Sequence, residues 1–181
     1  MARIFVALTP TKTFNKQIIE IKKDLKKGIL KNQNISWQEN SNHHITLNFI
    51  GEMEPEQLDQ LNVGIENFIT SRSPIALEIV EISLFPNSSG QVLVAYINLT
   101  AQLKRIHDRL GDLISSIGFE THLKKFRPHI TLGRFKEKTS EDFSFHEVTE
   151  NIRSISLTID TYESEFESGK VNFKLIKSFK N

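Results

Sequence analysis

Residues 43–51 read "HHITLNFIG" and residues 127–135 read "RPHITLGRF", so the tetrapeptide His-Ile-Thr-Leu occurs at 44–47 and again at 129–132. The two copies lie about half a chain apart in a protein of 181 residues. Each copy lies in a mostly apolar run, which is typical of a strand with at least one buried face. A repeat at the same place in each half predicts a duplicated architecture with an approximate two-fold axis.

The segments around the repeat follow the same order in both halves: a strand, a helix, the strand with the repeat, and further sheet. Apolar residues at helical spacing predict helices within 14–28, 55–68 and 100–118. Strands are expected near residues 3–8, 36–38, 75–85, 91–97, 155–161 and 171–179, and an acidic loop is expected at 136–150. Because strands and helices do not alternate regularly, the strands are expected to be antiparallel.

These patterns predict an α+β fold formed by one bilobal domain over residues 1–181. Each of the two similar lobes is expected to carry one copy of the repeat, an antiparallel sheet and flanking helices. A pseudo-two-fold axis would then relate the lobes across a central cleft.

Composition restricts the function classes. The chain has no cysteine, which excludes disulfides, thiolate-bound zinc and cysteine nucleophiles. The net charge is +1, which does not indicate affinity of the whole protein for polyanions, although the lysine-rich stretch 12–31 and the basic stretch 104–136 allow a local basic surface. No apolar run is long enough to cross a bilayer, and the first residues lack a signal-peptide pattern, so we expect a cytoplasmic protein. A monomer is expected.

The repeated tetrapeptide places polar groups on one face of each strand. Successive side chains of a strand alternate faces, so His44 and Thr46 share one face while the isoleucine and leucine of that copy point to the other. His129 and Thr131 are expected to do the same in the second copy. If the lobes face one another, two imidazoles and two hydroxyls meet in one cleft.

Two imidazoles in one cleft are suited to general acid–base catalysis. The unperturbed pKa of histidine is about 6.5, so one ring can be neutral while the other is protonated near neutral pH. Two histidines with two threonines make a poor metal site, and we expect neither a metal nor a cofactor. His43 is expected on the opposite face and partly exposed, and surface positions are expected for His107, His122 and His146.

These motifs resemble the two-histidine phosphoesterase superfamily, and more narrowly the RNA 2',3'-cyclic phosphodiesterases, long called the 2'-5' RNA ligase family. The resemblance covers nearly the whole chain, and its most specific part is Arg-Pro-His-x-Thr-Leu at 127–132. Its other elements are residues 3–8, Trp37, residues 44–51, Phe85-Pro86-Asn87, Gly118-Phe119, Arg134, Tyr162-Glu163-Ser164 and Gly169. The chain departs from the family at 92–96, where a tryptophan would be expected; either Tyr96 or Trp37 compensates in packing, or the substrate end of the cleft differs.

The resemblance implies a bilobal fold and hydrolysis of a terminal 2',3'-cyclic phosphate to a 2'-phosphate. It implies that His44 is the proton donor to the leaving 3'-oxygen and that His129 is the proton acceptor that activates water. Thr46 and Thr131 would hold the phosphate. The partner would be RNA with a 2',3'-cyclic phosphate end, or a small cyclic nucleotide.

Two further binding residues follow from the resemblance: Arg134 as a phosphate contact and Phe49 as an aromatic that stacks on the terminal base. Strict alternation, however, puts both on the face opposite the histidines unless the strands end, twist or bulge. By the same alternation, Arg127 shares the face of His129 and is a second candidate for phosphate contact, and Asn48 occupies the corresponding face in the first copy.

Three alternatives remain open from the sequence. The same chemistry could act on another cyclic phosphate or on a 2'-5'-linked oligonucleotide. The reverse ligation reaction could also occur. A module that binds RNA ends without catalysis is a third possibility, which both intact His-x-Thr pairs disfavour.

Overall fold

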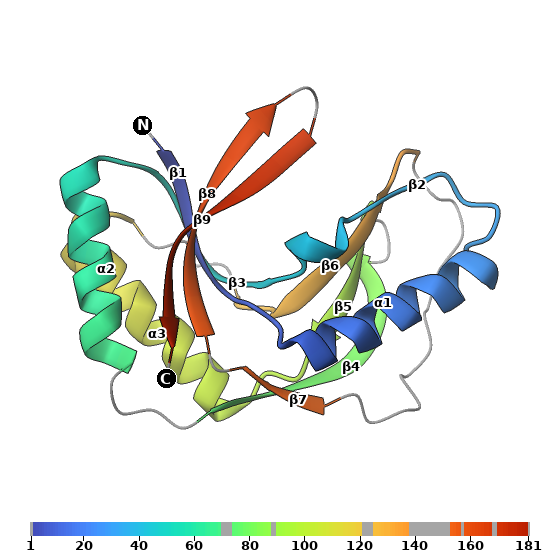
Figure 1. Cartoon of the computed structure of the whole chain (residues 1–181), viewed down its shortest axis with the longest axis horizontal. Helices are drawn as coiled ribbons and strands as arrows, with labels where there is room; N and C mark the ends of the chain where they lie inside the picture. The colour runs from blue at the N-terminus through green and yellow to red at the C-terminus, as the bar shows by residue number, and fades with distance from the viewer. Residues whose placement is uncertain are drawn as a thin grey trace.

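A computed structural model describes residues 2–69, 74–87, 90–120, 125–137, 153–156, 158–167 and 170–180 (Figure 1). His122, His146 and most of the expected acidic loop lie outside the described residues. The described elements, in chain order, are β1 (Ala2–Leu8), α1 (Lys12–Lys27), β2 (Ile35–Trp37), a 3₁₀ turn (Asn40–Asn42), β3 (Ile45–Met53), α2 (Pro55–Ile69), β4 (Ile75–Phe85), β5 (Val92–Ile97), α3 (Ala101–Ser116), β6 (His129–Phe135), β7 (Arg153–Ser156), β8 (Thr158–Glu167) and β9 (Lys170–Lys180).

The strands form one antiparallel sheet in the order β7-β4-β5-β6-β3-β1-β8-β9, with β2 added to β6. This arrangement confirms the predicted α+β class and the antiparallel pairing. The sheet has two arms, a β3 arm (β3, β1, β8, β9) and a β6 arm (β6, β5, β4, β7, β2). The assigned pairing between the arms is Ile45 with Ile130, one residue from each copy of the repeat.

The sheet differs from expectation near its C-terminal end. One strand was expected near residues 155–161, but β7 pairs with β4 in the β6 arm, whereas β8 pairs with β1 in the β3 arm. The chain therefore changes arms between these two strands. Hydrophobic periodicity does not predict this change, because it does not reveal which neighbour a strand has.

Helices α1 and α3 each pack against the arm to which the preceding strand does not belong, so we call them the exchanged helices. Helix α1 follows β1 of the β3 arm but lies beside the β6 arm and contacts β7, whereas α3 follows β5 of the β6 arm and contacts β3 (Figure 1). Helix α2 contacts β9 and α3. Threonines cap both exchanged helices: Thr11 accepts from the Phe14 amide at 3.3 Å, and Thr100 accepts from the Leu103 amide at 3.1 Å.

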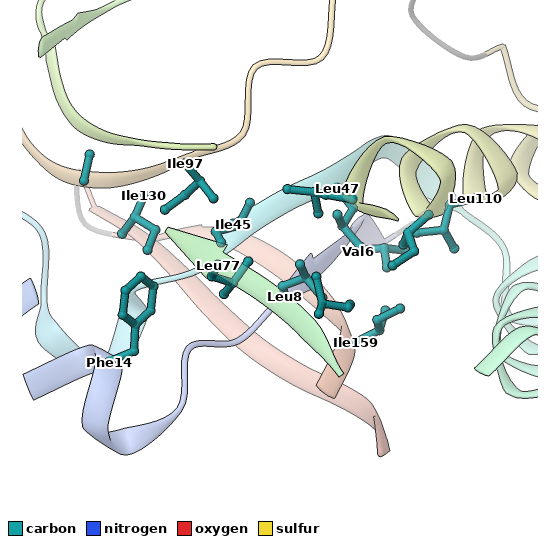
Figure 2. Close-up of a cluster of buried hydrophobic side chains, with 14 of the residues drawn as sticks. Val6, Leu8, Phe14, Ile45, Leu47, Leu77, Ile97, Leu110, Ile130 and Ile159 are labelled. Atoms are coloured by element: carbon teal, nitrogen blue, oxygen red, sulfur yellow. The ribbon is translucent and has the colours of Figure 1, made fainter. Parts of the chain in front are cut away.

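The hydrophobic core lies between the helices and one face of the sheet. Figure 2 shows Ile45 and Ile130 in this cluster, together with Leu47 and the helical residues Phe14 and Leu110. The exposed fractions of Ile45 and Ile130 are both 0%. Burying a side chain of this size contributes roughly 1.5–3 kcal/mol. The apolar half of each repeat therefore anchors its strand in the core, as alternation predicts.

Among the helices of the described residues, none is both long and apolar enough to cross a membrane.

Candidate active site

The register between the arms brings the two copies of the repeat together. Because Ile45 pairs with Ile130 in antiparallel fashion, extending the register by one residue in each direction sets His44 opposite Thr131 and Thr46 opposite His129. Residues opposite one another in a sheet share a face. We call the face that carries these four side chains the histidine face.

Strand β3 contains a bulge at the last residue of its motif. Thr46 pairs with Ala7 and Asn48 pairs with Val6, so Leu47 has no partner in β1. An extra residue in one strand reverses the alternation beyond it. Phe49 pairs with Phe5, two residues before Ala7, and therefore lies on the histidine face. The prediction that Asn48 lies on the histidine face is wrong for the same reason.

Strand β6 has the equivalent bulge. Thr131 pairs with Val94 and Gly133 pairs with Leu93, so Leu132 is the extra residue. Arg134 pairs with Val92, two residues from Val94, which returns its side chain to the histidine face. The close approach of β2 explains a glycine here: Gly133 pairs with Trp37, and a Cβ at position 133 would lie 2.8 Å from Ile35 Cγ2, closer than real Cβ contacts.

The two bulges remove the conflict between alternation and the family pattern. Phe49 and Arg134 each lie five residues after a histidine and occupy equivalent positions in the two arms. Both are exposed, and the exposed fraction of Phe49 is 45%. The Arg3 guanidinium lies 5.9 Å from the centroid of the Phe49 ring. The Arg134 side chain forms no hydrogen bond or ion pair with any described residue.

The two histidines share one backbone interaction. The Nδ1 atom of His44 lies 2.8 Å from the Asn42 carbonyl oxygen, and the Nδ1 atom of His129 lies 2.7 Å from the Arg127 carbonyl oxygen. A carbonyl oxygen only accepts, so each Nδ1 carries the proton. Each Nε2 is therefore left to accept a proton when the ring is neutral and to donate one when it is charged.

His129 lies beside two aromatic rings of the β6 arm. The Phe85 ring stacks on it at 4.4 Å between centroids, and the Tyr96 ring lies at 6.2 Å. Burial lowers the pKa of His129 and the nearby charge of Arg127 lowers it further, while the hydrogen bond to the Arg127 carbonyl acts in the opposite direction. The balance favours the neutral ring.

Arg127 is held near His129 by contacts with the same two aromatic residues and with Pro86. Its guanidinium donates to the Pro86 carbonyl and, at 2.7 Å, to the Tyr96 hydroxyl. It also lies 4.8 Å from the Tyr96 ring centroid and 5.6 Å from that of Phe85. Arg127 is exposed, as a candidate for phosphate contact must be. The contacts that its side chain makes in the structure, however, are with the residues around His129.

Aromatic residues of the β3 arm surround His44. The ring centroid of His44 lies 5.1 Å from that of Phe5, 4.9 Å from that of Phe173 and 6.3 Å from that of Tyr162. Burial lowers the pKa of His44, the charge of His129 lowers it further, and the hydrogen bond to the Asn42 carbonyl raises it. Sequence reasoning missed Phe173, because only the pairing of β9 with β8 brings it to this site.

The motif threonines are available to a ligand. Thr46 and Thr131 are half-buried, and neither hydroxyl bonds to another described residue. Within the described ranges, no group of three or more histidine, aspartate or glutamate residues is arranged to hold a metal ion.

His43 is buried, contrary to expectation, with 3% of its surface exposed. Its Nε2 accepts from the Lys22 ammonium at 3.1 Å, and its Nδ1 donates to the Asn15 side chain at 2.6 Å. The same ammonium donates to the Gln38 carbonyl and to the Asn40 side chain. This network supplies hydrogen-bond partners to the buried His43 ring and to the Lys22 ammonium, which an analysis of apolar patterns does not detect.

The surface position expected for His107 is also wrong. His107 is half-buried on α3, its Nδ1 donates to the Leu47 carbonyl at 2.8 Å, and its ring stacks on Phe126 at 4.1 Å between centroids. The contact of α3 with β3 brings this histidine to the first motif.

The geometry combines two imidazoles of defined tautomer, two hydroxyl donors, an exposed arginine and an exposed aromatic ring on one face. Such a set can bind an anionic phosphodiester, transfer protons on both sides of a phosphorus atom and stack on a planar base.

Sequence and structure comparisons find proteins that are similar to this chain over most of its length. The curated RNA 2',3'-cyclic phosphodiesterase of Methanocaldococcus jannaschii is 26% identical over 180 residues, covering 99% of this chain and 91% of that protein. The structure of TT0787 from Thermus thermophilus matches with a TM-score of 0.84 at 18% identity, covering 98% of this chain and 97% of that one. The structure of E. coli LigT complexed with 3'-AMP matches with a TM-score of 0.77 at 19% identity, covering 99% and 97%.

A family model provides the assignment. The model of the 2'-5' RNA ligase superfamily matches residues 10–163, a range that contains both motifs. The resemblance predicted from the repeated tetrapeptide is thereby confirmed, and the chain belongs to the 2'-5' RNA ligase superfamily.

Proposed function

We propose that this protein hydrolyses the 2',3'-cyclic phosphodiester at the end of an RNA to a 2'-phosphomonoester, by acid–base catalysis with two histidines and without a metal ion. The observation that carries the proposal is the matched pair of Nδ1–carbonyl hydrogen bonds, which leaves the Nε2 atoms of His44 and His129 for the substrate. The curated relative named RNA 2',3'-cyclic phosphodiesterase supports the substrate class, and the 3'-AMP complex of E. coli LigT supports a nucleotide ligand.

The reaction begins at His129. Its neutral Nε2 takes a proton from water as the water oxygen attacks phosphorus. The bond between phosphorus and the 3'-oxygen breaks, and the protonated Nε2 of His44 gives its proton to that oxygen. The products are a 2'-phosphomonoester and a free 3'-hydroxyl. Exchange of protons with solvent then restores both rings.

The protonation states needed for this reaction follow from the surroundings. Burial lowers the pKa of both rings, so both favour the neutral state without a ligand. The negative charge of a bound phosphodiester raises the pKa of a nearby histidine. His44 is therefore protonated by binding substrate, whereas the adjacent Arg127 charge keeps the pKa of His129 low.

The remaining side chains orient the substrate. The free hydroxyls of Thr46 and Thr131 donate to the non-bridging phosphate oxygens. Arg134 adds a charge-assisted contact from the β6 arm, and Phe49 stacks on the terminal base from the β3 arm. Arg127, the second candidate for phosphate contact, is better supported as the residue that holds and tunes His129.

The test is a product assay on an oligoribonucleotide with a 2',3'-cyclic phosphate end. Purified protein is expected to give the 2'-phosphomonoester at the same rate with and without EDTA. A 3'-phosphate product would refute the assigned polarity, loss of activity in EDTA would refute metal independence, and survival of the substrate would refute the function. A series of substrates from a mononucleotide to an oligonucleotide distinguishes RNA from a small cyclic phosphate.

Substitution of the histidines tests the mechanism. His44→Gln and His129→Gln are each expected to lower turnover roughly 10²–10⁴-fold, the usual contribution of a positioned acid or base. Lys104→Gln, on the exposed surface of α3, is the matched control and is expected to retain wild-type turnover. Wild-type turnover in either histidine variant would contradict the proposed roles.

A further inference from the structure

The extra residue of each bulge, Leu132 in β6 and Leu47 in β3, has a carbonyl that accepts a hydrogen bond from outside the bulged pair of strands. In β6, the carbonyl of Leu132 accepts from the main-chain amide of Gln38, directly after β2, at 2.9 Å. In β3, the carbonyl of Leu47 accepts from Nδ1 of His107 at 2.8 Å. The donor at the β6 bulge is therefore a main-chain amide, whereas the donor at the β3 bulge is a side chain.

The His107 ring is itself held in place. It stacks on Phe126 at 4.1 Å with an interplanar angle of 4°, and Phe126 immediately precedes Arg127 and the second motif. Since the Leu47 carbonyl only accepts, His107 Nδ1 carries the proton. His107 therefore connects the bulge of the first motif to the chain that enters the second motif.

The β3 bulge has one clear consequence on the histidine face: it brings Phe49 there. Without the extra residue, strict alternation would turn Phe49 toward the core face. Phe49 is 45% exposed, so few neighbours fix its orientation, and its direction follows from the backbone of β3.

We propose that His107 is a positioning residue that stabilises the β3 bulge, holds Phe49 toward the substrate and so sets the affinity for the nucleobase of the terminal nucleotide. This inference rests on the proposed function. Under this inference, affinity for the nucleobase depends on His107 and Phe49, whereas affinity for the phosphate depends on the motif residues that bind it directly.

Two variants separate the hydrogen bond from the ring stack. His107→Phe keeps a ring against Phe126 and loses the donor. His107→Asn loses the ring but offers an amide N–H close to the position of Nδ1. Both are compared with wild type on adenosine 2',3'-cyclic phosphate and on 1-O-methyl-ribose 2',3'-cyclic phosphate, which has no base. Urea unfolding confirms that each variant is folded under the assay conditions.

His107→Phe is expected to raise KM for the adenosine substrate about fivefold or more, in line with the loss of a stacked base, and to change KM for the base-free substrate less than about twofold. His107→Asn is expected to retain most of the wild-type KM. In a Phe49→Ala background, His107→Phe should have no further effect on the adenosine substrate, because the two substitutions remove the same interaction.

Equal losses on the two substrates, or an undiminished effect in the Phe49→Ala background, would show that His107 is merely structural and overturn the inference while leaving the proposed function intact. A wild-type protein inactive on both substrates and on cyclic-ended RNA would refute the proposed function and this inference with it.

Discussion

Acidification is expected to destabilise the protein through His43. The Lys22 ammonium donates to its Nε2, so protonation of the buried ring would place a second positive charge next to the first, away from water. Burial first, and then the charges of Lys22 and His44, lower the pKa of His43 from its usual 6.5 to about 3. Between these two values the unfolded chain binds a proton that the folded protein does not, so the free energy of unfolding falls as pH falls through this window.

The magnitude follows from the same shift. Each pH unit within the window changes the free energy of unfolding by about 1.4 kcal/mol, so acidification from pH 7 to pH 4.5 removes about 2–3 kcal/mol through His43 alone. This is a large fraction of the roughly 5–15 kcal/mol that stabilises a typical domain.

The assay is urea unfolding at several pH values between 7 and 4.5, followed by the fluorescence of Trp37, the single tryptophan of the chain. His43→Gln serves as the reference, because Gln does not titrate while His44 and His129 titrate in both proteins. The stability of the wild type relative to His43→Gln should fall by about 2–3 kcal/mol over this range. A difference that stays constant from pH 7 to pH 4.5 would refute the assignment.

Three further outcomes are expected. Because burial lowers the pKa of both motif histidines, and catalysis needs His129 neutral and His44 protonated, kcat/KM should peak below pH 6.5; a maximum above pH 7.5 would contradict this. Arg127→Met removes a charge that lowers the pKa of His129, so the acidic limb of kcat/KM should move to higher pH, and an unmoved limb would leave Arg127 without a tuning role. Gly133→Ala forces a Cβ to within 2.8 Å of Ile35 Cγ2 and should cost roughly 1–3 kcal/mol of stability in urea titrations; an unchanged midpoint would show that β2 yields freely.

Periodicity predicted the fold class and both motif faces because the relevant information is local. Ile45 and Ile130 are buried, and His44 and His129 turn to the opposite face, as a two-residue alternation requires. The faces of Phe49 and Arg134 could not be derived in this way. A bulge adds one residue and reverses every later position, and nothing in the pattern of Leu47 or Leu132 signals it.

Tertiary partners account for the other differences. His43 and His107 look like surface polar residues in the sequence, yet one meets the Lys22 ammonium and the other meets the Leu47 carbonyl. Each partner lies on an element distant in the chain, and α3 reaches β3 only because the helices are exchanged between the arms. Side-chain burial of this kind depends on packing that no single segment encodes.

The near-equivalence of the two arms has a consequence for reaction direction. If the proposed function holds, His44 and His129 have the same tautomer and the same kind of backbone anchor, so neither of these two features decides which ring is the acid and which is the base. The difference comes from neighbours outside the repeated tetrapeptide: burial and then the Arg127 charge lower the pKa of His129, while Phe49 and Arg134 lie at matched positions where they would hold the substrate in one orientation. The direction in which the cyclic phosphate opens is therefore encoded beside the two motifs and not within them.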